Sequence, residues 1–99
     1  MLNITKEQND GTMKVALEGR LDTTTSPELE KMLKENLDDV TELILDFEKL
    51  EYISSAGLRV LLSAQKIMNK QGEMRLINVC DEVKEIFEVT GFLDFLNVE

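Results

Sequence analysis

Residues 52–62 read Tyr52-Ile53-Ser54-Ser55-Ala56-Gly57-Leu58-Arg59-Val60-Leu61-Leu62, and they connect an extended segment to a helix. From Ser55 to about Gln71 the apolar side chains recur with helical spacing, which predicts that helix. The first turn of a helix has unpaired N–H groups and the positive end of the helix dipole. Ser54 or Ser55 can therefore be a simple N-cap, and a phosphoryl group on Ser55 would be tolerated there.

The segments on both sides of this helix predict two parallel strands. Residues 43–47 are nearly all apolar and are bounded by polar residues, which is typical of a central strand buried on both faces. Residues 74–79 form another extended segment after Gly72. A strand, a helix and a strand in this order form a right-handed crossover, so the two strands lie parallel in one sheet.

The N-terminal half predicts a hairpin and a helix. Residues 9–11 read Asn-Asp-Gly and favour a turn between a short first strand and the alternating apolar residues of 13–17. Ser26 and Pro27 then provide a hydroxyl N-cap and a proline at the first helical position. We predict that this helix ends near Leu37 and covers one face of the sheet.

The C-terminal part predicts a third helix, which Asp81 can cap and which ends at Gly91. The apolar residues that follow must also pack against the fold. The whole order is β-β-α-β-α-β-α with a possible short C-terminal strand. This order predicts a mixed-sheet α/β fold, and we expect a single domain over residues 1–99.

The composition limits what the domain can bind. The chain has 99 residues, one cysteine and no histidine, so we expect neither an internal disulfide nor a zinc site of the usual ligands. Its formal charge of −9 repels polyanions, which argues against direct nucleic-acid binding. The acidic balance fits either a solvated exterior or a basic protein partner. Because no apolar run approaches the roughly 18 residues of a membrane span, we expect a cytoplasmic protein without membrane insertion.

Two carboxylates are candidates for the neighbourhood of Ser55. Asp22 follows the second strand and Asp46 lies in the central strand, and ligand sites in open α/β sheets favour the carboxyl ends of strands. Each aspartate can be functional there or can simply cap a loop. Without a histidine, Ser55 lacks the usual base, so we expect no catalytic centre, no metal site and no cofactor.

The helix that begins at Ser55 has an apolar arc wider than a surface helix needs. Either a neighbouring helix covers the excess, or part of the arc meets a partner protein. Gly57 permits a close backbone approach, to a neighbouring strand or to a ligand. Arg59 lies on the narrow polar stripe, where it can pair with an acidic partner residue or be solvated.

Three blocks of this sequence resemble the STAS domain, and in particular the stand-alone anti-sigma factor antagonists of bacteria. The blocks are residues 19–22, residues 43–47 and residues 52–62, and residues 90–93 resemble the family's turn after its last long helix. The resemblance extends over essentially the whole chain. It implies a STAS-type mixed β-sheet with the helices packed mainly on one face.

The resemblance also implies a function. Antagonists of this family bind a serine kinase that is also an anti-sigma factor, release the sigma factor, and are switched off by phosphorylation. The phosphorylated hydroxyl maps onto Ser55, and Ser54 stands where many members have aspartate, so it is a competing acceptor. A serine phosphatase would reset the switch. The residues expected to contact the partner are Asp22, Thr23, Ser54, Ser55, Ala56, Gly57, Leu58 and Arg59, with Asp46 as a supporting acidic residue.

A different interpretation is also compatible with this resemblance. The chain would then be a STAS accessory subunit of a membrane lipid or anion transporter, and it would act without phosphorylation.

Overall fold

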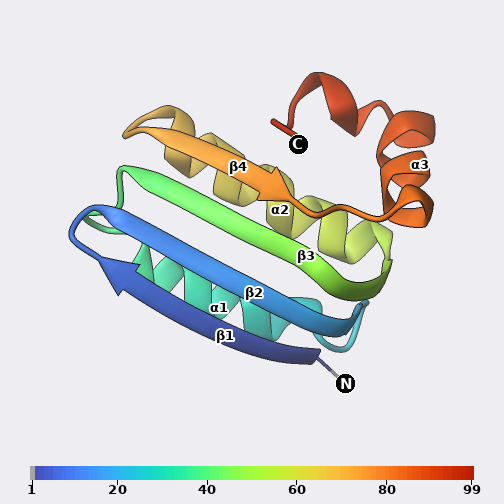
Figure 1. The fold of residues 1–99 in the computed structure, drawn as a ribbon, viewed down its shortest axis with the longest axis horizontal. Helices are drawn as coiled ribbons and strands as arrows, with labels where there is room; N and C mark the ends of the chain where they lie inside the picture. The colour runs from blue at the N-terminus through green and yellow to red at the C-terminus, as the bar shows by residue number, and fades with distance from the viewer. Residues whose placement is uncertain (1) are drawn as a thin grey trace.

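The computed structural model describes residues 2–99, which form a four-stranded sheet and three α-helices (Figure 1). The strands lie in the order β1-β2-β3-β4, which is also their order in the sequence. The elements in chain order are β1 (Leu2–Asn9), β2 (Thr12–Leu21), α1 (Ser26–Asn36), β3 (Glu42–Ile53), α2 (Ser55–Asn69), β4 (Glu73–Ile77), α3 (Asp81–Thr90) and the 3-10 helix η1 (Phe92–Asp94).

The sheet is mixed, as the sequence predicts. β1 and β2 pair antiparallel through the tight turn at Asp10 and Gly11, and Asp10 has a positive φ of 57°. β2 pairs parallel with β3, and β3 pairs parallel with β4. The predicted hairpin and the predicted crossover through α2 are both confirmed.

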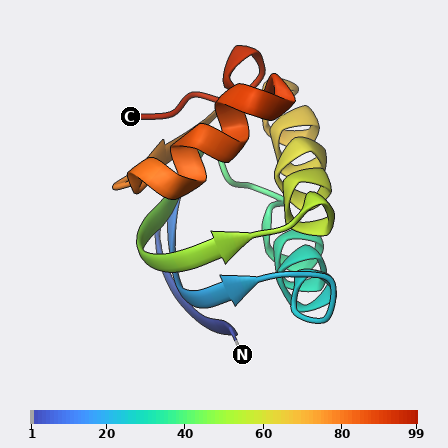
Figure 2. The same ribbon diagram turned by 90° about the vertical axis from the view of Figure 1, so that its right-hand side faces the viewer.

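The helices α1 and α2 cover one face of the sheet. Figure 2 shows α1 and α2 side by side against that face, with α3 above them in this view. The core lies between the two layers and is built from alternate residues of the strands together with the inner faces of the helices. Its strand residues are Met13, Val15, Leu17, Leu21, Leu43, Leu45, Phe47, Leu50, Ile53, Met74 and Leu76.

The prediction that the central strand is buried on both faces is wrong. In β3, Leu43, Leu45 and Phe47 are buried, whereas Ile44 and Asp46 between them are partly exposed. α3 lies across the edge of the sheet beyond the end of β4 (Figure 2), and the ring of its Phe87 lies 6.3 Å from the ring of the buried Phe47. Because α1 and α2 cover one face and α3 one edge, the opposite face of the sheet stays open to water.

Most of the wide apolar arc of α2 is buried within the domain. Leu58, Leu61 and Met68 are in the core, and Val60 and Ala64 lie beside α1. The interpretation that the fold itself covers the excess apolar surface is therefore confirmed for these positions.

Two of the predicted helix caps are placed differently. Ser26 is the first residue of α1 rather than its N-cap, and its hydroxyl donates back to the carbonyl oxygen of Asp22. Asp81 is likewise the first residue of α3, and Cys80 occupies the N-cap position without a side-chain hydrogen bond. The predicted end of α3 is confirmed, because Gly91 follows it in the left-handed conformation with φ of 80°.

The C-terminal segment reaches the free edge of β4. Val98 forms a single parallel bridge with Leu76, and the backbone N–H of Glu99 donates to the carbonyl oxygen of Leu76 at 2.8 Å. The possible short C-terminal strand is thus reduced to one bridge. Within residues 2–99, no helix is both long enough and apolar enough to cross a lipid bilayer.

Candidate functional site

β2 and β3 end next to each other at one edge of the sheet. Leu21 pairs with Ile53 at the ends of these strands, and the N–H of Ser54 donates to the carbonyl oxygen of Leu21 at 2.9 Å. The chain therefore leaves the sheet at two adjacent points. One exit leads through the loop 22–25 into α1, and the other leads directly into α2.

The carboxylate of Asp22 holds the loop before α1 in shape. Its Oδ1 accepts hydrogen bonds from the backbone N–H of Thr24 at 3.0 Å and of Thr25 at 3.1 Å, and from the Thr24 hydroxyl at 2.8 Å. The Thr25 hydroxyl donates to the carbonyl oxygen of Arg20 at 2.8 Å and so ties the loop to the end of β2. The loop-capping interpretation of Asp22 accounts for all of these contacts.

These contacts also favour the ionised form of Asp22. The hydrogen bond from the Thr24 hydroxyl is the main cause that holds the pKa of this carboxyl below its ordinary value, and the two backbone N–H groups act in the same direction. The guanidinium Nε of Arg20 lies 3.9 Å from Oδ2. Asp22 therefore stands at this edge as a fixed negative charge.

Ser54 and Ser55 have different surroundings at the start of α2. Ser54 is the N-cap, and its hydroxyl oxygen accepts from the N–H of Gly57 at 3.4 Å. Ser55 is the first helical residue and its side chain is exposed. No carboxylate lies in the first turn of α2. A negative charge on Ser55 would therefore meet the positive end of the helix without an acidic neighbour in that turn.

Gly57 and Leu58 lie in the core, although both were expected to contact a partner. A Cβ atom on Gly57 would lie 2.8 Å from side-chain carbons of both Ile53 and Leu21. The absence of a side chain lets the first turn of α2 pack closely on the strand ends, so the packing interpretation of Gly57 accounts for its position. The two residues shape the start of α2 and present no exposed side chain.

A shallow groove separates the first turns of α1 and α2. Its volume is about 180 Å³. Three of the expected partner-binding residues, Thr23, Ala56 and Arg59, line it, and the side chains of Thr23 and Arg59 are exposed. The structure thus brings the loop after β2 and the start of α2 together into one surface. The other lining residues are Ser26, Pro27, Glu30 and Val60.

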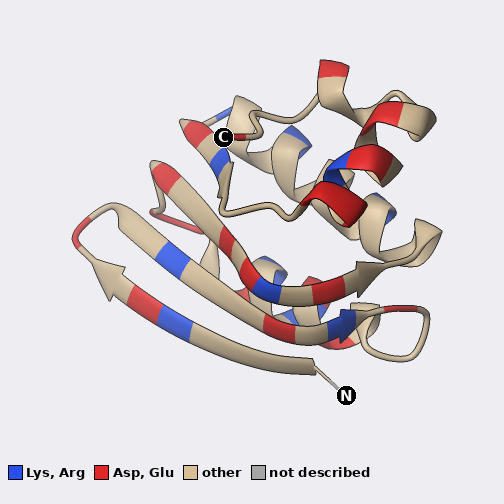
Figure 3. Ribbon diagram, turned by 45° about the vertical axis from the view of Figure 1, so that its right-hand side comes forward, with Lys and Arg blue, Asp and Glu red and all other residues tan. Residues whose placement is uncertain are grey.

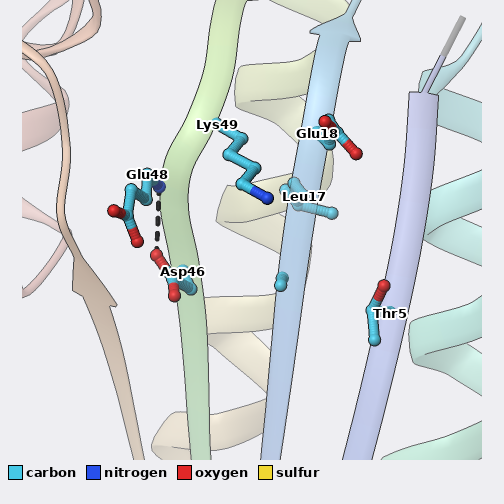
Figure 4. A pocket seen from close by; sticks show the side chains of 7 residues that line it. Thr5, Leu17, Glu18, Asp46, Glu48 and Lys49 are labelled. Atoms are coloured by element: carbon cyan, nitrogen blue, oxygen red, sulfur yellow. Dashed lines mark hydrogen bonds between the residues drawn. The ribbon is translucent and has the colours of Figure 1, made fainter.

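Asp46 does not join this surface. Its Oδ1 accepts from the N–H of Glu48 at 3.0 Å (Figure 4). The same atom accepts from the side-chain amide of Asn78 at 3.1 Å, and Oδ2 lies 4.0 Å from the Nζ of Lys14. It occupies the open face of the sheet, seven residues before β3 ends at Ile53. The expectation that Asp46 lies beside Ser55 is therefore wrong, because its strand extends farther than the apolar run indicates.

Several residues that shape the site were not singled out from the sequence. Thr24 and Thr25 fix the carboxylate of Asp22, and Pro27 and Glu30 form one side of the groove. The threonines could have been found, because an aspartate followed by hydroxyl residues is typical of a side-chain-capped turn. The groove residues depend on how two helices pack, which no local pattern indicates. Among residues 2–99, no cluster of His, Cys, Asp and Glu is arranged to hold a metal ion.

The fold and the site define a class of protein: a small mixed-sheet α/β domain in which an exposed serine begins the second helix beside a surface groove. The chain belongs to the STAS domain family, whose match extends over residues 3–99.

Relatives of known name support the same family. The chain is 36% identical over 99 residues to BtrV of Bordetella bronchiseptica, which carries the name of an anti-sigma factor antagonist; the match covers 98% of this chain and 85% of BtrV. It is 32% identical to the anti-sigma-B factor antagonist of Staphylococcus aureus, with 98% of this chain and 92% of that protein covered.

Solved structures share the fold. An anti-sigma factor antagonist from Mycobacterium paratuberculosis superposes with a TM-score of 0.89 at 21% identity, covering 99% of this chain and 85% of that one. The phosphorylated form of the Bacillus protein SpoIIAA superposes with a TM-score of 0.77 at 20% identity, covering 98% of this chain and 91% of that one.

Proposed function

We propose that this chain is an anti-sigma factor antagonist that binds an anti-sigma factor with serine kinase activity and is switched off by phosphorylation of Ser55. The observation that carries the proposal is the exposed Ser55 hydroxyl at the start of α2, next to a groove that can receive a partner. The names of two relatives more than 30% identical over nearly the whole chain support the antagonist function. The same names give less support to the alternative function, a STAS accessory subunit of a membrane transporter.

The unmodified protein would bind its partner through the surface formed by Asp22, Thr23, Ser54–Ala56 and Arg59. A kinase that docks there has the Ser55 hydroxyl within its own active site. Binding of the antagonist to the anti-sigma factor would displace the sigma factor and allow transcription. Arg59 provides a positive charge on the groove, and we assign it the role of pairing with an acidic residue of the partner.

Phosphorylation would weaken this complex without unfolding the domain. The Ser55 oxygen forms a bond to the γ-phosphorus of ATP and gives its proton to a base of the kinase, while the bond from the γ-phosphorus to the bridging oxygen breaks and ADP leaves. ATP and its magnesium ion belong to the kinase. The product carries roughly −1.5 to −2 charges, which the N–H groups and the dipole of α2 partly compensate. A tenfold loss of affinity for the kinase requires only about 1.4 kcal/mol.

The fixed charge of Asp22 adds to this effect. Its loop lies next to the start of α2, because Leu21 and Ile53 are paired at the strand ends. A phosphate on Ser55 would therefore place two negative groups at one edge of the partner surface. A serine phosphatase would remove the phosphate by hydrolysis and restore binding. All of these partners act in the cytoplasm, where we place the protein.

The proposal is tested with the anti-sigma kinase of the same organism. The wild-type chain and the variants Ser55→Ala, Ser54→Ala and Ser63→Ala are incubated with the kinase and ATP, and the mass of each intact protein is measured. Ser63 lies farther along α2 and is the matched control. We expect one phosphate on the wild type, on Ser63→Ala and on Ser54→Ala, and none on Ser55→Ala.

Binding is measured in the same experiment by calorimetry. The phosphorylated chain should bind the kinase at least about tenfold more weakly than the unmodified chain, while its far-UV circular dichroism stays unchanged. A phosphate on Ser55→Ala but none on Ser54→Ala would assign the phosphorylation site to Ser54 instead of Ser55. Absence of any binding to the kinase would refute the antagonist function.

A further inference from the structure

A second surface of the molecule combines exposed apolar side chains with strong negative charge. Four large hydrophobic residues are exposed within residues 2–99, and three of them lie close together in sequence: Val89 at 79% exposure, Phe95 at 64% and Leu93 at 38%. The fourth, Tyr52, is accompanied by Arg20, whose guanidinium lies 4.3 Å from the centre of its ring. Residues 89–95, from the end of α3 to the residue after η1, therefore contain three of the four exposed large apolar side chains.

Val89 stands between two hollows on α3. One, of about 270 Å³, is formed by Ile86, Val89 and Thr90 together with Glu82 and Glu85. The Thr90 hydroxyl donates to the carbonyl oxygen of Ile86 at 2.7 Å, so its polar group is already used within the helix. Apolar groups thus form much of this hollow, and carboxylates stand beside it.

The second hollow lies on the other side of Val89 and has a volume of about 620 Å³. It is wide and open, and charged residues surround it: Asp81, Lys84, Glu85 and Glu88. Val89 is therefore an exposed apolar side chain between two hollows whose rims carry charge, which is how the apolar centre and polar rim of an interface are arranged.

The aromatic residues after α3 are held in place. Gly91 turns the chain with φ of 80°, and the ring of Phe92 meets the ring of Phe95 edge to face at a centroid distance of 6.5 Å. The N–H of Phe95 donates to the carbonyl oxygen of Phe92 at 3.0 Å. Phe95 is therefore exposed in a defined orientation. A partner that covers it loses little conformational entropy on binding.

The charge of this segment selects the kind of partner. Residues 81–94 contain five acidic side chains and one basic side chain, a net charge of −4 within a chain of −9. Figure 3 shows the acidic residues gathered along α3. A second copy of this chain would bring like charges together, and an anionic lipid surface would be repelled. A basic partner is attracted.

We propose that α3 and η1 form a second docking surface, which receives an amphipathic helix carrying apolar side chains on one face and lysine or arginine on its flanks. The apolar side chains of that helix cover Val89, Leu93 and Phe95, and its cations face Glu82, Glu85 and Glu88. None of these residues lines the groove beside Ser55. Binding here is therefore independent of the phosphorylation site and of the proposed antagonist function.

The test uses a model helix as the probe. A peptide of leucine and lysine with helical periodicity is titrated into the full chain labelled with ¹⁵N at physiological ionic strength, and amide shifts are followed by NMR. A peptide with glutamate in place of lysine is the second probe. We expect saturable shifts confined to residues 82–95 with the lysine peptide, and none with the glutamate peptide.

Matched variants separate the contribution of the apolar side chains to peptide binding from that of the negative charge. Val89→Ser and Phe95→Ser should each weaken binding about tenfold, and Glu85→Gln together with Glu88→Gln should weaken it and reduce its dependence on salt. Tyr52→Ser and Glu48→Gln are the controls, because they remove an exposed apolar side chain and an exposed carboxylate elsewhere. Ser55→Ala should bind as the wild type does.

Three results would overturn the proposal. Unchanged affinity in Val89→Ser and Phe95→Ser would show that the peptide binds by charge alone. Shifts centred on the start of α2 would place the peptide in the groove beside Ser55. Shifts of residues 89–95 that grow with protein concentration without any peptide would identify a second copy of this chain as the occupant.

Discussion

The two ends of the parallel strands are closed in different ways. At the end where these strands begin, the connections bond to one another through the backbone. The N–H groups of Thr41 and Glu42 donate to the carbonyl oxygen of Gly11 at 2.7 and 3.1 Å, and the N–H of Glu73 donates to the carbonyl oxygen of Thr41 at 3.0 Å. Gly72 passes so close to Thr41 that a Cβ atom would overlap its carbonyl oxygen.

At the opposite end, one backbone hydrogen bond from Ser54 to Leu21 joins the two exits, and side-chain oxygens shape the residues that follow. Asp22 shapes the loop before α1, and Ser54 caps α2. This arrangement leaves the side chains of Thr23 and Ser55 exposed. Under the proposed function, this difference decides where a phosphate can be added: the backbone contacts at the first end leave little space, whereas the exposed start of α2 offers free N–H groups to an anion. We expect substitutions at the two ends to have different consequences.

The largest effect is expected at the end that is closed by the backbone. In Gly72→Ala the new methyl group overlaps the Thr41 carbonyl, so the connection before β4 must move and its hydrogen bonds weaken. We expect the free energy of unfolding to fall by about 3 kcal/mol. Urea denaturation followed by circular dichroism measures this as a lower midpoint at an unchanged slope.

Gly57→Ala is the matched control at the other end. Its methyl group would lie 2.8 Å from γ carbons of the buried Ile53 and Leu21 side chains, which must shift, whereas the atoms overlapped in Gly72→Ala belong to the backbone. Alanine also favours the helix. We expect a loss of about 1 kcal/mol. If Gly57→Ala destabilised the domain as much as Gly72→Ala does, the two ends would be equally rigid and the contrast between them would fail.

A smaller effect separates the two serines at the start of α2. Ser54→Ala removes the N-cap, and we expect the free energy of unfolding to fall by about 1 kcal/mol. Ser55→Ala removes an exposed hydroxyl, and we expect a change within about 0.5 kcal/mol. Urea denaturation at neutral pH measures both changes in the free energy of unfolding. Equal losses in the two variants would mean that the Ser55 hydroxyl is structural, which would count against its role as a phosphate acceptor.

Local patterns predict the elements of this fold because each pattern is a property of neighbouring residues. The turn at residues 9–11, the helical spacing after Ser55 and the glycine at 91 are each confirmed. The order of these elements also predicts the mixed sheet, and the resemblance added helices packed mainly on one face. The expected strand topology placed Asp22 near the start of the helix at Ser55, and the pairing of Leu21 with Ile53 brings the two strand ends together.

The errors arise where distant segments meet. The apolar run 43–47 has the composition of a strand buried on both faces, but α1 and α2 cover one face only and α3 lies across the edge, which leaves Ile44 and Asp46 on the open face. The start of α1 was shifted by one residue, because the carboxylate of Asp22 organises the turn that Ser26 was expected to cap. Sequence spacing does not show which side-chain oxygen a backbone N–H will find.

The smallest effect concerns the charge of Asp22. Its pKa is lowered in the folded protein, chiefly by the Thr24 hydroxyl, so the folded state binds its proton less readily than the unfolded state, in which the ordinary value of 3.8 applies. The resulting stabilisation is present above pH 3.8 and is lost as the pH falls through the lowered pKa. We expect it to be smaller than the effect of the Ser54 cap, because water reaches the carboxylate.

Thr24→Val tests this cause directly, because it removes the hydroxyl and leaves the two backbone donors in place. The pKa of Asp22, measured by NMR titration of its carboxyl carbon, should rise toward 3.8 in Thr24→Val. Asparagine keeps an oxygen acceptor but has no charge. The wild type should therefore have a larger free energy of unfolding than Asp22→Asn near neutral pH, and this difference should shrink in acid. An Asp22 pKa that did not change in Thr24→Val would mean that the backbone N–H groups and the Thr25 hydroxyl hold the charge, and the Thr24 hydroxyl would not be the main cause of the lowered pKa.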